Sequence, residues 1–136
     1  MISRLIACGA LACCLVAGGA VASADRAGAK LFKGKTSQGY RIKAQVRDQA
    51  FRIHVFDIDL RCRDGSELAL IMGGYLWTKV GKRGSFRDAQ FGRTDSTYFR
   101  GRLSERRLRG RLRMTDRLSD GTRCASRWIA FNATPR

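Results

Sequence analysis

Apolar and polar residues alternate along most of the chain after residue 30, with the period of two that is typical of half-buried β-strands. The clearest example is 40–46, where the even positions are apolar and the odd positions are polar. No segment after residue 24 shows the 3.6-residue period of an ordinary helix. We therefore expect strands near 31–34, 40–47, 50–62, 67–79, 84–90, 97–103, 107–115 and 122–132.

Two of these strands depart from simple alternation. In the third, the apolar face runs through Ile53 and Val55 and then changes phase at Phe56, which predicts a bulge near Val55–Phe56. Residues 68–72 form a continuous apolar run, which is typical of a strand that is covered on both faces.

The segments between the strands carry turn signals. Asp64-Gly65 and Asp120-Gly121 are dipeptides that favour tight reversals of the chain. Short strands at close spacing indicate an all-β fold, and the length of 136 residues fits one domain. We expect a small antiparallel barrel or sandwich of about eight strands. In an up-and-down order, the end of the third strand and the start of the eighth lie at the same rim.

The first 24 residues have the pattern of a secretory signal peptide. Arg4 is their one charged residue, an apolar stretch follows, and the small residues Ala22–Ala24 suit the signal peptidase. A retained membrane anchor and a lipoprotein cleaved before Cys8 are the alternatives. We expect a signal peptide at 1–24 and a single secreted or periplasmic β domain at 25–136, with no transmembrane segment after cleavage.

Cleavage also separates the five cysteines into two groups. Cys8, Cys13 and Cys14 leave with the signal peptide, whereas Cys62 and Cys124 remain. An even pair of cysteines in an exported protein predicts a disulfide, and two buried free thiols are the alternative. On the chain-entropy model, this bond stabilises the fold by ~4 kcal/mol.

The charge of the chain is strongly positive, at a formal net value of +16 from 27 Lys+Arg and 11 Asp+Glu. Removing residues 1–24, which carry one of these charges, leaves 112 residues and +15. An apolar fraction of 44% nevertheless argues against wholesale disorder.

The segment from Ser96 to Arg117, both included, contains eight arginines. Because side chains alternate across a strand, six of them share one face of a predicted hairpin, namely Arg100, Arg102, Arg107, Arg109, Arg111 and Arg113. Like charges that oppose each other across a sheet are destabilising. The pattern therefore indicates either a solvated outer face or a surface that binds phosphate, sulfate or carboxylate groups.

Other candidate chemistry in the sequence is weaker. Gly34-Lys35-Thr36 lacks the spacing of a phosphate-binding loop, so we expect no nucleotide. His54 is the one histidine and has no evident metal-binding partners, so we expect no metal and no cofactor. Asp57 and Asp59 share a strand face, but pairing with the nearby arginines 52, 61 and 63 is a simpler interpretation than acid–base catalysis.

The segment Phe32–Gly39 resembles the F-x-G-K-T-S-Q-G opening of a group of small, uncharacterised exported bacterial β proteins. Cys62–Gly65, Gly101, Gly110 and Cys124 match the looser remainder of that pattern. The resemblance implies a secreted, disulfide-bonded β domain and carries no known activity. The Gly-x-Trp opening of a conventional lipocalin is missing from the sequence.

Together these features predict a non-enzymatic binding module, because no set of acid, base and nucleophile emerges from the sequence. Its expected partner is an anionic envelope polymer or an anionic lipid surface, bound by the arginine-rich strand face. One alternative is a barrel that holds an apolar ligand against Ile53, Leu70, Met72 and Trp77. Another is an inhibitor of a secreted enzyme.

Overall fold

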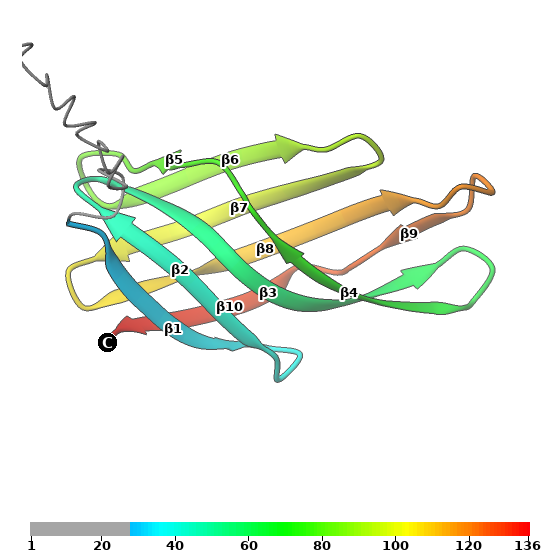
Figure 1. Cartoon of the computed structure of the whole chain (residues 1–136), viewed down its shortest axis with the longest axis horizontal. Coiled ribbons are helices and arrows are strands. Elements are labelled where there is room, and N and C mark those ends of the chain that lie inside the picture. Colours follow the sequence, from blue (N-terminus) through cyan, green and yellow to red (C-terminus); the bar gives the residue numbers. More distant parts are fainter. Residues whose placement is uncertain (1–27) are drawn as a thin grey trace, which may run out of the picture.

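The computed structural model describes residues 28–136, and every regular element in that range is a β-strand (Figure 1). The expected signal peptide and Cys8, Cys13 and Cys14 lie outside the described residues. Across residues 28–136, no helix has the length and apolar character needed to cross a membrane. The strands are β1 (Lys30–Thr36), β2 (Arg41–Arg47), β3 (Ala50–Cys62), β4 (Glu67–Gly73), β5 (Thr78–Lys79), β6 (Ser85–Phe91), β7 (Asp95–Ser104), β8 (Arg107–Arg117), β9 (Arg123–Ala125) and β10 (Ile129–Pro135).

The strands form a closed antiparallel barrel, which decides between the two predicted all-β architectures. A hydrogen-bonded circuit of six strands runs β1–β2–β3–β9–β8–β10 and returns to β1. β7 and β6 extend the sheet beyond β8, while β4 and β5 pair with the other edge of β3. Figure 1 shows β1–β3 as one wall of the barrel and β6–β8 as the other, with β10 joining them beside β1.

The predicted eight strands become ten because two of them are interrupted. Residues 74–77 separate β4 from β5, and residues 126–128 separate β9 from β10. No backbone pairing joins β5 to β6 within the described sheet, and side chains bridge them instead. The Gln90 amide accepts from Leu76 N at 2.8 Å and donates to Leu76 O at 3.1 Å, while Thr78 Oγ1 donates to Asp88 Oδ2 at 2.6 Å.

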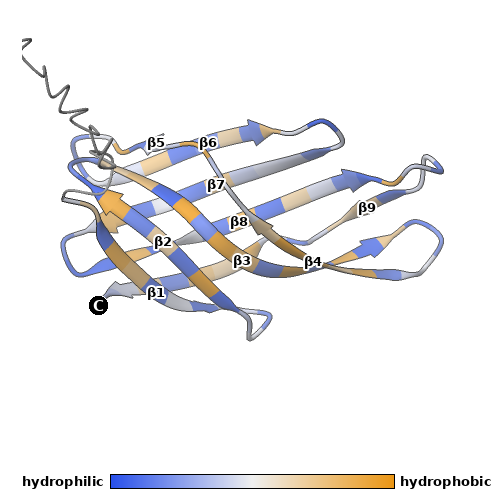
Figure 2. Cartoon of the chain, in the orientation of Figure 1, coloured by the Kyte–Doolittle hydropathy of each residue, from blue (hydrophilic) through white to orange (hydrophobic). Residues whose placement is uncertain are grey.

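The inward-facing residues of all the walls meet in one hydrophobic core, as the alternation of apolar and polar positions predicts (Figure 2). Aromatic rings occupy its centre: the Tyr75 ring lies 5.7 Å from Phe56 and 5.3 Å from Phe99, measured between centroids. Burial raises the pKa of Tyr75 to about 12, and its hydroxyl shares a 3.0 Å hydrogen bond with the buried Thr97.

The bulge predicted in the third strand is confirmed, whereas the expectation for residues 68–72 needs correction. The extra residue of the bulge is His54, next to the predicted position, since the register passes from Lys43–Val55 to Ala44–Ile53. The run 68–72 is not covered on both faces. It lies in β4, which pairs with β3 alone among the described strands and leaves Ile71 78% exposed.

The predicted disulfide is confirmed. Cys62 at the end of β3 and Cys124 in β9 are direct cross-strand partners, and their sulfur atoms are bonded. The bond reinforces a short pairing between β3 and β9, because this pairing consists of the cysteine pair and Arg61–Ala125 alone. The Asp-Gly turns frame this rim: Asp64 accepts hydrogen bonds from Ser66, and Asp120 accepts one from Thr122. These bonds lower the pKa of both carboxyl groups.

Candidate functional site

The β7–β8 hairpin places all six predicted arginines on the outer face of the barrel, because residues of the opposite parity fill the core. Its register sets arginine directly against arginine at two positions. Arg100 opposes Arg111, and Arg102 opposes Arg109. We call these four residues the arginine tetrad. Arg107 lies beyond it at the hairpin end, opposite Ser104, and Arg113 lies beyond it on the other side, opposite Tyr98.

Two facing glycines separate the two arginine pairs of the tetrad. Gly101 and Gly110 are cross-strand partners between the two pairs, and their missing side chains leave room for the Phe86 and Phe131 rings of the core. A Cβ on Gly110 would lie 2.5 Å from the Arg100 carbonyl oxygen and 2.9 Å from Phe131 Cζ, so a larger residue does not fit.

A shallow depression of about 580 Å³ lies over this glycine pair. The tetrad, Ala130 and Phe131 complete its lining. Four guanidinium groups on flexible stems therefore surround an open surface that a phosphate, sulfate or carboxylate group can reach.

The six predicted arginines carry no internal counter-charge. None of them forms an ion pair with a carboxylate of residues 28–136, whereas Arg61 and Glu67 elsewhere in that range are paired at 3.5 Å. Like-charged side chains in direct opposition cost stability, and no carboxylate of residues 28–136 offsets that cost here. The arrangement leaves an uncompensated positive potential over the outer face of β7 and β8.

Two further residues border the tetrad and were not singled out from the sequence. Arg87 on β6 opposes Arg100, which extends the Arg100–Arg111 pair to three adjacent strands. Arg100 also stacks its guanidinium over the Trp128 ring, 4.3 Å from the centroid. Trp128 is 39% exposed and lies in the interruption between β9 and β10, where strand alternation gives no signal. Arg87 was missed because the apolar pattern of 84–90 is weak.

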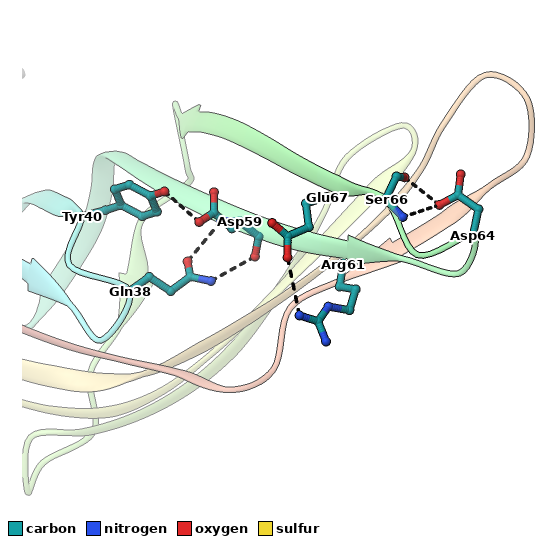
Figure 3. A network of polar contacts seen from close by, with 7 residues as sticks. All are labelled: Gln38, Tyr40, Asp59, Arg61, Asp64, Ser66 and Glu67. Carbon is teal, nitrogen blue, oxygen red and sulfur yellow. Dashed lines mark hydrogen bonds and ion pairs between the residues drawn. The ribbon is translucent and has the colours of Figure 1, made fainter.

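Asp57, Asp59 and Glu67 lie on a different part of the barrel, on the outer face of β3 and β4. Figure 3 shows Asp59 and Glu67 with their polar contacts. Asp59 accepts a 2.7 Å hydrogen bond from the Tyr40 hydroxyl, and the Gln38 amide bonds both the Asp59 backbone N and O at 3.1 Å. The hydrogen bond to Asp59, followed by desolvation, raises the pKa of Tyr40. The predicted arginine pairing of Asp59 is therefore wrong. Arg61 pairs with Glu67, and Arg52 donates to Gln45 Oε1 at 2.7 Å.

The Phe32–Gly39 segment has a structural role in this fold. Phe32 is buried in the core, and Gln38 fastens the β1–β2 turn to β3. Ser37 fastens the same turn to β10, since its backbone N donates to Ala130 O at 2.7 Å and its Oγ accepts from Ala130 N at 3.1 Å. Gly34-Lys35-Thr36 lies within β1 and not in a loop that precedes a helix.

The remaining candidate residues do not assemble into a second site. His54 is exposed at the β3 bulge, and residues 28–136 hold no group of three His, Cys, Asp or Glu side chains placed to bind a metal. Of the residues proposed to line an apolar cavity, Ile53 is buried within the core and Leu70 and Met72 pack against it. Trp77 lies elsewhere, with Arg47 and Arg52 stacked on its ring at 4.4 and 5.0 Å from the centroid.

Comparisons of the chain with known proteins give no functional assignment: no protein family model, no curated protein and no solved structure matches it. The geometry of the outer face is therefore the basis on which a function is proposed.

Proposed function

We propose that this domain is a non-enzymatic, exported binding module that uses the arginine tetrad to bind phosphate, sulfate or carboxylate groups of an anionic envelope polymer or lipid surface. The observation that carries the proposal is the direct opposition of Arg100 with Arg111 and of Arg102 with Arg109, without carboxylate partners in residues 28–136. A bound anion offsets the repulsion between these arginines. Anion binding therefore gives a reason for the opposed arrangement.

The interior of the barrel supports this outer-face proposal over the apolar-ligand alternative. Phe51, Phe56 and Phe99 are each 1% exposed or less, and the ring of Phe51 lies 4.5 Å from that of Phe86. Close-packed aromatic side chains of this kind occupy the space that an internal ligand needs. The inhibitor alternative has no comparable support, because no described feature points to an enzyme cleft as its partner.

The test is binding of the oxidised protein to a sulfated polysaccharide and to vesicles containing an anionic phospholipid, each across a salt series. One variant replaces Arg100, Arg102, Arg109 and Arg111 with Gln. The matched control makes the same change to Gln at four exposed arginines outside the tetrad, so that both variants lose the same charge. These arginines are Arg63, Arg83, Arg93 and Arg123. The two ligands distinguish a polymer source of the anionic groups from a lipid source.

We expect the tetrad variant to lose at least tenfold in affinity at about 0.15 M salt and to show a shallower dependence of log K on log salt. The control variant should retain affinity within about threefold, since its charges lie outside the tetrad. Equal losses in the two variants would mean that net charge alone attracts the ligand, and the proposal of a tetrad site would be wrong.

A further inference from the structure

One pair of the arginine tetrad, Arg102 and Arg109, begins a longer row of exposed polar and cationic residues. The strand register continues from Arg102 and Arg109 to Asn132 on β10, then to Lys35 on β1, and then to Arg41 on β2. Each residue is the direct cross-strand partner of the one before it, and all five are exposed. We call this set the cationic row. Four of its five members are positively charged.

The cationic row is curved. It follows the hydrogen-bonding direction of the sheet, in which neighbouring strands lie ~4.8 Å apart, so its four steps cover ~20 Å of backbone arc. The strands that carry the row can be followed in Figure 1: β7 and β8 belong to one wall, β10 and β1 lie side by side, and β1 and β2 belong to the other wall.

The row also has defined ends. Beyond Arg102, the next cross-strand partner is the uncharged Ser85 on β6. Beyond Arg41 comes β3, whose outer face presents Asp57 and Asp59. An anionic chain that follows the row is attracted over five strands and then repelled by these carboxylates.

We infer that the anionic ligand is a flexible linear polyanion, such as a sulfated polysaccharide, that lies across the strands along the cationic row. This inference rests on the proposed function and adds that Lys35 and Arg41 are ligand-binding residues. A flat lipid bilayer can face one wall of the barrel at a time, whereas a flexible polymer can follow the row from the tetrad around β10 and β1. Anionic groups repeated along such a polymer then meet Arg102, Arg109, Lys35 and Arg41 together.

The experiment measures the affinity of the oxidised protein for sulfated oligosaccharides of graded length, from below ~10 Å to well above ~20 Å, the arc set by the strand spacing. The test variant carries Lys35→Gln and Arg41→Gln. Its matched control carries Lys82→Gln and Arg83→Gln, which remove the same two kinds of charge from the exposed turn between β5 and β6. The tetrad variant described above is measured in parallel.

For the unmodified protein, we expect affinity to rise at least tenfold between the short and the long oligosaccharides. The Lys35/Arg41 variant should lose most of that gain and reduce the slope of log K against log salt by about 1.5 for long oligosaccharides. It should bind short oligosaccharides as the unmodified protein does, and the Lys82/Arg83 control should behave like the unmodified protein at every length.

The outcomes separate the two proposals. If the tetrad variant loses binding but the Lys35/Arg41 variant keeps the full length dependence, the tetrad is the site and the wrapped polymer is wrong. The same conclusion follows if the unmodified protein binds vesicles tightly and shows no length dependence. If the tetrad variant binds oligosaccharides of all lengths as well as the unmodified protein, the proposed function itself is wrong.

Discussion

Opposed arginines set the energetics of the outer face at the scale of single residues. Arg111 faces Arg100 directly, and Arg100 in turn faces Arg87 on its other side. The stacking of Arg100 on Trp128 holds one of these guanidinium groups on an aromatic face, where the ring quadrupole attracts the cation. That contact does not remove the repulsion between Arg100 and Arg111, because the ring carries no net charge. A residue kept in this arrangement costs stability in the absence of a ligand.

The cost is measurable in the variant Arg111→Gln. Removing one charge from a directly opposed pair should raise the free energy of unfolding by ~0.2–1 kcal/mol at low salt. The gain should shrink as salt screens the repulsion between the remaining charges. Urea unfolding at two salt concentrations measures both effects. Arg83→Gln in the β5–β6 turn is the control, and an equal gain in that variant would show that overall charge, not opposition, is responsible.

At the scale of elements, β4 carries the large apolar side chain with the highest exposed fraction among the described residues, Ile71. One edge of β4 pairs with β3, its other edge has no strand partner among the described residues, and Ile71 projects from its outer face. An apolar strand with a free edge can pair with other chains, and proteins commonly counter this with charged residues. Glu67 at the start of β4 is its one charged side chain.

We predict that Ile71→Lys reduces aggregation without loss of stability. The side chain is 78% exposed, so its removal should change the free energy of unfolding by less than ~0.5 kcal/mol. A lysine at the edge disfavours pairing with a second chain. Light scattering during heating measures the effect. Ser119→Lys, in the exposed turn between β8 and β9, adds the same charge away from the β4 edge as a control and should leave aggregation closer to that of the unmodified protein.

Local sequence pattern predicts most elements of this barrel, and long-range register accounts for what it misses. The observed bounds of β2, β3, β6, β7 and β8 lie within two residues of the predicted runs, because alternation of buried and exposed positions acts over neighbouring residues. The closure of β10 onto β1 joins residues about a hundred positions apart. The local pattern alone therefore cannot show that Lys35 continues the row from Arg109. Nor does it indicate that Trp128 lies beside Arg100.

The whole molecule has an uneven charge distribution around a closed ring of strands. The six predicted arginines lie on the outer face of β7 and β8, the cationic row continues this charge to β2, and the carboxylates of β3 and β4 lie beyond it. A basic surface that ends at an acidic one orients an approaching polyanion as well as attracting it. Closure of the ring keeps these surfaces in fixed relation, since the walls that carry them are joined through β10 and through β9.

The two junctions should differ in what they contribute. β9 meets β3 through two residue pairs and the Cys62–Cys124 bond, whereas β10 makes five pairs with β1 and five with β8.

Replacing both cysteines with serine should lower the free energy of unfolding by ~4 kcal/mol, because the bond closes a long loop in the unfolded chain. Hydrogen exchange should speed up first in β9 and at the end of β3. Binding under native conditions should persist within about threefold, because the row crosses the β10 junction. A loss of binding as large as that of the tetrad variant, in protein that is still folded by hydrogen exchange, would show that the row depends on closure at the disulfide as well.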